Sequence, residues 1–273
     1  MKNLRLFAPI LLASSAFAQN APPLPRSLPQ LAADLPSLVH NKQFQLGPFS
    51  DAVDQAIRNE PSSIPEAAAI AAKDLQDPDP AVKANALGLM HAIAVTPQGA
   101  SALQVAADPI AQVLTQGDDL SQRMALLVAA DLNEQAPDSF IAPLERLVQA
   151  PNTDDTIRVR AATALGLCRP KDETAQNLIA NAIDNTAVPQ SVRNEILFHS
   201  ASAESGSILT DNAVRLANTA TDKSTRDSAI RAVTKMGPNA VARIRQRLVA
   251  IQNDPTESLY SHEVSSAALQ SLR

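Results

Sequence analysis

Breaks between helical segments recur along this chain at a nearly constant spacing. When each segment is aligned at one anchor position, successive anchors lie 33 to 40 residues apart. The anchors are Val82, Gln122, Ile157, Val192, Thr225 and Val264. A period of this length corresponds to two helices and their turns, and one such pair cannot bury its apolar face alone. We therefore expect a stack of helix pairs rather than a globule around one centre.

The composition favours helices over strands. The 273 residues include 7 Gly, 1 Tyr and no Trp, although 45% of them are hydrophobic. Sheets normally place β-branched and aromatic residues in strands and Gly in turns, so we predict an all-α fold. The expected packing positions lie four and five residues after each anchor. They are Ala86 and Leu87, Leu126 and Leu127, Ala161 and Ala162, Ile196 and Leu197, Ala229 and Ile230, and Ala268 and Leu269.

Charged residues also recur at fixed distances from the anchors. Most copies carry Asp three residues before the anchor and a basic residue one residue after it. An Asp at this place is a good N-cap, and a residue four positions later shares its helix face. We expect each basic residue to pair with the Asp one turn before it. The alternative is a basic ridge for an acidic partner, made of Lys83, Arg123, Arg158, Arg193 and Arg226.

Three copies of this pattern resemble the HEAT-repeat family, in particular its short bacterial repeats related to PBS-lyase repeats. The copies are residues 77–83 with Ala86 and Leu87, residues 154–158 with residues 161–166, and residues 222–226 with Ala229. The resemblance covers residues 62–273 and implies a right-handed α-solenoid of about six helix pairs. It also implies that the second helices of the pairs form the concave face. The first helices are expected near 64–76, 99–115, 138–150, 172–185, 207–219 and 238–252, and the second near 80–95, 120–135, 156–168, 190–203, 223–236 and 257–272.

The chain begins with the pattern of a secretory signal peptide. Lys2 and Arg5 precede a short apolar run, and Ala16-Phe17-Ala18 ends it with small residues. We predict that residues 1–18 are a signal peptide cleaved after Ala18, and that the protein is exported to the periplasm or secreted. The run is too short to span a membrane, so no transmembrane segment is expected.

Residues 19–49 contain six prolines, a density that favours extended conformation over helix. We predict a proline-rich tether or arm there, followed by a repeat domain over residues 50–273. Whether residues 50–60, around Val53 and Ile57, form a full extra repeat or a single capping helix stays open at this stage.

The sequence contains no recognisable catalytic or cofactor motif. The four His residues do not have metal-ligand spacing, and the single pair His262-Glu263 cannot supply the four His-Glu pairs of a HEAT-like iron hydroxylase. Cys168 is the single Cys, so an intramolecular disulfide is excluded. We expect its side chain to be buried. We predict no enzymatic activity, no cofactor and no metal site. An unrecognised site around His199 or Cys168 is the enzymatic alternative.

The charge balance also limits the possible partners. The net charge of −5 becomes −7 once Lys2 and Arg5 leave with the signal peptide, which disfavours nucleic acid. We predict a scaffold that binds a protein or peptide on its concave face. An envelope-assembly component tethered by the proline-rich segment is the structural alternative. Helix periodicity turns positions two, three, six and ten residues after each anchor away from the packing columns. The candidate contact residues at such positions are Asn85, Arg160, Asn194, Glu195, Asp227, Arg231 and Lys235.

Overall fold

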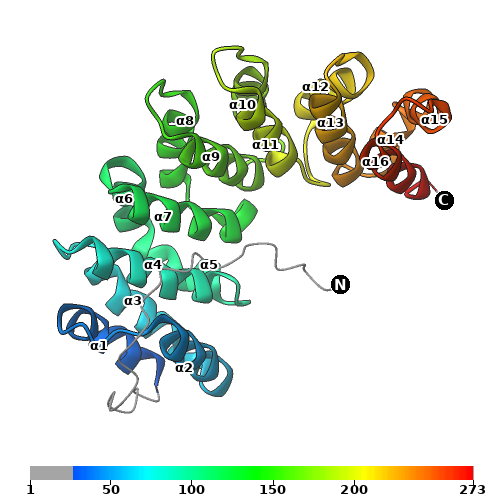
Figure 1. Cartoon of the computed structure of the whole chain (residues 1–273). Coiled ribbons are helices and arrows are strands. Elements are labelled where there is room, and N and C mark those ends of the chain that lie inside the picture. Colours follow the sequence, from blue (N-terminus) through cyan, green and yellow to red (C-terminus); the bar gives the residue numbers. More distant parts are fainter. Residues whose placement is uncertain (1–26, 273) are drawn as a thin grey trace.

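The computed structural model describes residues 27–272, and this part of the chain is an all-α solenoid. Its helices stack side by side along an arc (Figure 1). The predicted signal peptide and residues 19–26 lie outside the described residues. No strand occurs within residues 27–272. The all-α solenoid predicted from the repeat spacing is therefore confirmed.

Two layers of helices make up the arc. The inner layer contains α2 (Leu46–Asn59), α4 (Pro80–Ala94), α7 (Asp119–Leu132), α9 (Asp155–Cys168), α11 (Gln190–Ser200), α13 (Lys223–Lys235) and α16 (Leu259–Gln270). The outer layer contains α1 (Leu28–His40), α3 (Ile64–Asp74), α6 (Ala107–Gln116), α8 (Ile141–Gln149), α10 (Glu173–Asp184), α12 (Ser207–Thr219) and α15 (Arg245–Asn253). Short helices α5 (Gly99–Ala102) and α14 (Pro238–Ala242), with several 3-10 turns, complete the outer segments. The second helices of the pairs thus line the concave side, as predicted.

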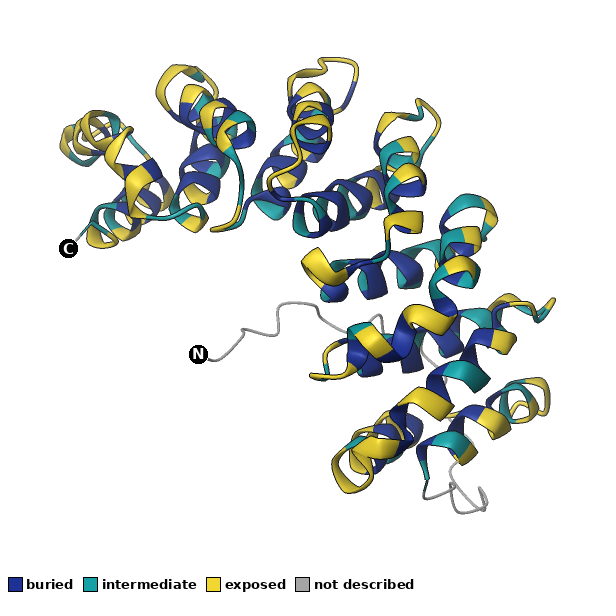
Figure 2. Ribbon diagram, turned by 180° about the vertical axis from the view of Figure 1, so that it is seen from behind, coloured by how far each residue is buried: buried dark blue, intermediate teal, exposed yellow. Residues whose placement is uncertain are grey.

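The core runs between neighbouring helices along the whole stack. Ala86, Ala161 and Ala229 are completely buried, and their small side chains allow consecutive inner helices to pack closely. Figure 2 shows buried residues along the helix faces that meet, and exposed residues on the concave and convex sides of the arc. Because each helix contacts its neighbours in the stack, the molecule has no single central core.

The N-termini of the inner helices show which anchors were correctly aligned. Asp79, Asp154 and Asp222 are N-caps whose carboxylates accept backbone N–H groups, as predicted. In α7 the cap is Asp118 rather than Asp119, which shifts the packing positions by one residue. Leu126 is buried as predicted, but Ala125 is buried with it instead of Leu127. In α16 the cap is Ser258, and Ser261, three residues before the anchor, is buried. The error in α7 arises because Asp118 and Asp119 are adjacent residues of equal capping ability.

The extended conformation predicted for residues 19–49 is wrong for residues 28–40 and 46–49, which are helical. Ser27 and Gln30 form a reciprocal capping box at the start of α1, and Pro29 occupies the first turn, where no N–H donor is required. Pro36 lies inside α1 and costs about 3 kcal/mol. Leu28, Leu31 and Leu35 are completely buried against the stack, and each contributes about 1.5–3 kcal/mol. Burial therefore outweighs the proline penalty.

Residues 50–60 belong to an additional helix pair. Helix α2 packs on α1 and α4, while α1 packs on α3 and α4. The side chains of Phe49 and Val53, on the apolar face of α2, are buried. Among the described residues the stack thus starts with the α1–α2 pair, which covers the apolar end of the repeats that follow.

Three basic residues after the anchors, Arg123, Arg158 and Arg226, make structural contacts, but their partners differ from those predicted. Arg158 is buried and donates to the backbone carbonyls of Val148, Pro151 and Thr153, which fixes the turn between α8 and α9. Arg123 pairs with Asp154 of the next inner helix at 3.3 Å. Pairing with the Asp one turn earlier is wrong for Arg158, because its guanidinium donates to backbone carbonyls, while Asp154 caps its own helix and pairs with Arg123.

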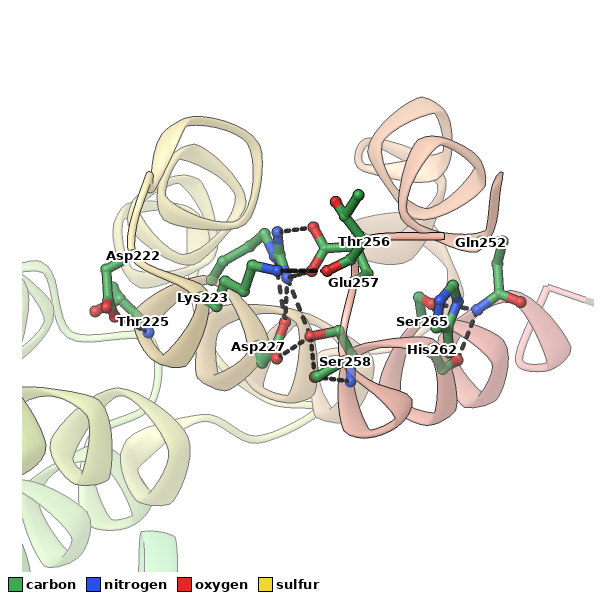
Figure 3. Close-up of polar contacts among 12 residues, drawn as sticks. Asp222, Lys223, Thr225, Asp227, Gln252, Thr256, Glu257, Ser258, His262 and Ser265 are labelled. Atoms are coloured by element: carbon green, nitrogen blue, oxygen red, sulfur yellow. Dashed lines mark hydrogen bonds and ion pairs between the residues drawn. The ribbon is translucent and has the colours of Figure 1, made fainter. Parts of the chain in front are cut away.

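Arg226 centres a buried network that joins the last two inner helices. Its guanidinium, only 2% exposed, donates to Glu257 at 2.6 and 2.9 Å and to Asp227 at 3.1 Å. Asp227 in turn accepts from the hydroxyl of Ser261 at 2.7 Å, and Lys223 pairs with Glu257 at 3.1 Å (Figure 3). The hydrogen bond from Arg226 holds the pKa of Glu257 down to about 2. The network fixes α16 against α13.

We predict that Arg226→Met lowers the free energy of unfolding by about 3–5 kcal/mol, because it leaves Asp227 buried without its cation and leaves Glu257 paired with Lys223 alone. The matched control is Arg243→Met, which removes an exposed ion pair with Asp211 and should cost no more than about 1 kcal/mol. Urea unfolding followed by circular dichroism measures both changes. Equal losses in the two variants would contradict a stabilising role specific to the buried network.

Candidate functional site

The exposed residues of the inner helices form the concave surface, and the sequence candidates divide into two groups on it. Asn85, Arg160, Glu195, Arg231 and Lys235 are exposed or half-buried. In contrast, Asn194 and Asp227 are buried, at 8% and 3% exposure. The prediction that these two residues lie on the surface is wrong.

The burial of Asn194 and Asp227 has a common cause. Both lie two residues after their anchors, and this position faces the next inner helix rather than the open side of the arc. Asn194 donates to the hydroxyl of Ser224 on α13 at 3.1 Å, and Asp227 accepts from Ser261 on α16. Position two of these two repeats therefore serves contacts between repeats, whereas the candidates at positions three, six and ten remain exposed or half-buried.

Asn85 and Arg160 lie on α4 and α9, apart from the other surface candidates. Asn85 donates to the carbonyl of Ala81 one turn earlier at 2.8 Å. Burial, and secondarily the nearby Arg123, lowers the pKa of Arg160, whose guanidinium lies 3.5 Å from the Arg123 carbonyl oxygen. These contacts are within or between neighbouring helices and do not form a cluster.

Arg231 and Lys235 meet an aromatic ring from the preceding inner helix. The Arg231 guanidinium carbon lies 3.8 Å from the centroid of the Phe198 ring, and the Lys235 ammonium lies 4.6 Å from it. Arg231 also donates to the hydroxyl of Tyr260 on α16 at 3.3 Å. Phe198, Arg231, Lys235 and Tyr260 thus form a cation–aromatic cluster contributed by α11, α13 and α16. Cations over aromatic faces contribute about 0.5–2 kcal/mol each.

A shallow hollow of about 370 Å³ adjoins this cluster. Its lining residues come from three consecutive inner helices, so the hollow exists only in the assembled stack. They are Phe198, Arg231, Thr234, Tyr260, Glu263, Val264 and Ala267.

The cations of the cluster have no acidic partner in the part of the chain that the structure describes. Within residues 27–272, no carboxylate forms an ion pair with Arg231 or Lys235. Lys235 instead donates to the carbonyl of Phe198 at 2.7 Å, near the C-terminus of α11, where the helix dipole favours a cation. Burial, and after it the neighbouring Arg231, lowers the pKa of Lys235.

Glu195, the remaining surface candidate near the cluster, is engaged with His199. Its carboxylate lies 2.9 Å from the imidazole Nε2, one turn away on α11. Burial lowers the pKa of His199, an effect that Glu195 opposes and that Lys235 and Arg231 reinforce. His199 also packs edge-on against Phe198, with ring centroids 4.9 Å apart. These contacts place His199 beside the ring as a packing and hydrogen-bonding residue.

The sequence interpretation missed Phe198 and Tyr260. Phe198 lies six residues after its anchor, a position already predicted to face outward, where Arg231 stands in the next repeat. Tyr260 is the single Tyr of the chain and precedes the expected packing positions of α16. Rare aromatic residues at outward positions were the available signal, since aromatic and Arg side chains are enriched at binding sites.

Neither enzymatic alternative gains a reactive group from the geometry. Cys168 is 1% exposed, and its thiol lies 3.3 Å from the carbonyl oxygen of Ala129. Burial raises the pKa of Cys168 to about 12. In the part of the chain that the structure describes, no three His, Cys, Asp or Glu side chains are grouped so that they could hold a metal ion. Helices long and apolar enough to cross a membrane are likewise absent from residues 27–272.

No family model and no curated protein matches the sequence. Among solved structures, an engineered protein from a structural genomics consortium has a TM-score of 0.49 at 17% identity, covering 90% of this chain and 72% of that one. A designed armadillo repeat protein in complex with the peptide (KR)4 has a TM-score of 0.47 at 15% identity, covering 90% and 99%. A structure of computationally designed armadillo repeat proteins for modular peptide recognition has a TM-score of 0.42 at 15% sequence identity. The match covers 90% of this chain and 100% of that one. Likenesses at this level say nothing about what this chain binds.

We predict that Cys168 does not react with a thiol reagent in the native protein at pH 8. The reaction needs the thiolate, and the thiol stays protonated at this pH because its pKa is raised to about 12. Absorbance after addition of an aromatic disulfide measures the reaction. The same protein in denaturant should react fully and serves as the control. Rapid stoichiometric labelling of the native protein would contradict this burial and reopen the enzymatic alternative.

Proposed function

We propose that this chain is a non-enzymatic scaffold that binds a protein or peptide on its concave face. The observation that supports this most is the cation–aromatic cluster. Its Arg231 lines an open hollow, its Lys235 lies over the Phe198 ring at the same hollow, and neither cation has a carboxylate partner among residues 27–272. Arg and aromatic side chains together are typical of the residues that contribute most to binding energy.

The stack provides a reason for placing such a cluster here. Phe198, Arg231 and Tyr260 are held on three helices whose opposite faces are buried, so little conformational entropy is lost when a partner binds. Arg226 and Asp227, directly beneath the exposed face of α13, fix the neighbouring helix that carries Tyr260. The concave surface is thereby preorganised.

We also propose that the protein acts after export, in the periplasm or outside the cell. The support is the pattern of residues 1–18, with its basic start, apolar run and small-residue end. A tethering role for residues 19–49 has less support, because residues 28–40 and 46–59 form α1 and α2 and pack into the stack.

Site-specific photo-cross-linking tests which face binds. A benzophenone amino acid at Ala267, which lines the hollow, should give a discrete adduct with a partner in extracts of the cells that produce the protein. The matched control position is Ala250, which is also an exposed alanine but lies on outer helix α15. The same benzophenone amino acid at Ala250 should give no adduct.

Charge reversal makes this test specific. Arg231→Glu should lower the yield of the Ala267 adduct about tenfold or more, because it replaces a cation of the cluster with an anion. Arg245→Glu, an equal change on the outer helix, should leave the yield unchanged. Adducts from Ala250 with none from Ala267 would show that the concave face is not the binding surface.

A further inference from the structure

Arg231 and Lys235 place two like charges next to each other without compensation. They lie four residues apart on α13, a spacing that brings their side chains onto the same helix face. Like charges at this spacing destabilise a helix. Both contact the Phe198 ring, which attracts cations without neutralising them. An anion bound between them would remove this repulsion.

Most of their hydrogen-bond donors are also unused within the described chain. A guanidinium has five N–H donors and an ammonium has three. Arg231 uses one nitrogen for the hydroxyl of Tyr260, and Lys235 makes one bond to the Phe198 carbonyl. Carboxylates accept from both kinds of donor, and bonds between ionised partners are roughly twice as strong as neutral ones.

Carboxylates near the cluster restrict how much negative charge a ligand can carry. Glu263 lines the same hollow, and Glu195 lies one turn before Phe198 on α11. The chain as a whole carries a net charge of −5. A continuous polyanion such as nucleic acid would meet repulsion on both sides of the two cations, since its binding depends on neutralising successive phosphates. The flanking charges therefore favour a single localised anion.

The remaining wall of the hollow is apolar. Val264 and Ala267 from α16 face the same space as the ring of Phe198, and Ala267 is exposed. An aliphatic side chain packed against them would be removed from water, which stabilises the complex by about 25 cal/mol per Å² of apolar area buried. Anionic and apolar recognition are thus adjacent, within one hollow of about 370 Å³.

We propose that this hollow binds an acidic peptide segment in which an Asp or Glu side chain lies next to an aliphatic residue. The carboxylate accepts hydrogen bonds from Arg231 and Lys235, and the aliphatic side chain packs on Phe198, Val264 and Ala267. This inference rests on the proposed function and adds the chemical class of the partner to it.

Three fluorescent eight-residue peptides, blocked at both ends, test the charge requirement. They share one sequence with a central Leu-Glu, Leu-Gln or Leu-Lys pair, and blocking removes the terminal carboxylate as an alternative ligand. By fluorescence anisotropy, the Glu peptide should bind the full mature protein about tenfold more tightly than the Gln peptide, a difference of about 1.4 kcal/mol. The preference should shrink as salt is added. Equal affinities, or binding of none of the peptides, would overturn the inference.

Variants locate the effect. Arg231→Gln with Lys235→Gln should reduce the ratio of the Glu and Gln peptide affinities to about one. The matched control combines Arg58→Gln and Arg245→Gln, which remove the same charge from exposed positions on α2 and α15 and should preserve the ratio. Circular dichroism checks that both double variants are folded. An equal loss in the control would reduce the effect to net charge and overturn the site.

Two further outcomes separate this inference from the proposed function. Tighter binding of an eight-nucleotide oligothymidylate than of the Glu peptide would overturn the acidic peptide as the ligand class. If Ala267 cross-links to a partner while Glu and Gln peptides bind equally, the concave face is a binding surface and only the carboxylate chemistry fails. If only Ala250 cross-links, the proposed function itself fails.

Discussion

Close packing between consecutive inner helices is the constraint on which the rest of this structure depends. Completely buried alanines such as Ala86, Ala161 and Ala229 lie on these helices, and their small side chains are consistent with a close approach of neighbouring helices. Because the contact repeats with every helix pair, the stack extends without a central core and keeps one face of each inner helix open. The concave surface is a direct consequence of this packing.

The cation–aromatic cluster shows what this arrangement can produce. No single repeat contains it, because Phe198, Arg231 and Tyr260 come from α11, α13 and α16. Its geometry therefore depends on the contacts between repeats. Asn194 and Asp227, which face the next helix, supply such contacts, and Arg226 links α13 to the turn before α16. Buried polar residues thus position exposed ones.

The solenoid and most helix boundaries were predictable because their signals are local. An Asp cap at Asp154 or Asp222 and the small residues after it lie within two turns of sequence, and the helix-pair period repeats them. Helix α1 was missed because its prolines are a local signal against helix, whereas the burial of Leu28, Leu31 and Leu35 is a tertiary effect.

The candidate site was predictable only in part, for a similar reason. Periodicity identified Glu195, Arg231 and Lys235 as surface residues, but it could not distinguish the open face from the face that meets the next helix. That distinction depends on how adjacent helices are rotated, and it decides the burial of Asn194 and Asp227. The same rotation brings Arg231 over Phe198, a contact between residues 33 positions apart that no local pattern contains.

Nuclear magnetic resonance of the free protein tests this central geometry most directly. A ring current shields protons above an aromatic face, so the side-chain methylene protons of Arg231 and Lys235 that border their charged groups should resonate upfield of their positions in unfolded peptides. Replacement of Phe198 by Leu should abolish both shifts while the helical content stays the same. Unshifted resonances in the native protein would show that the stack does not bring α13 cations onto the α11 ring, and would contradict the cluster from which the binding proposals begin.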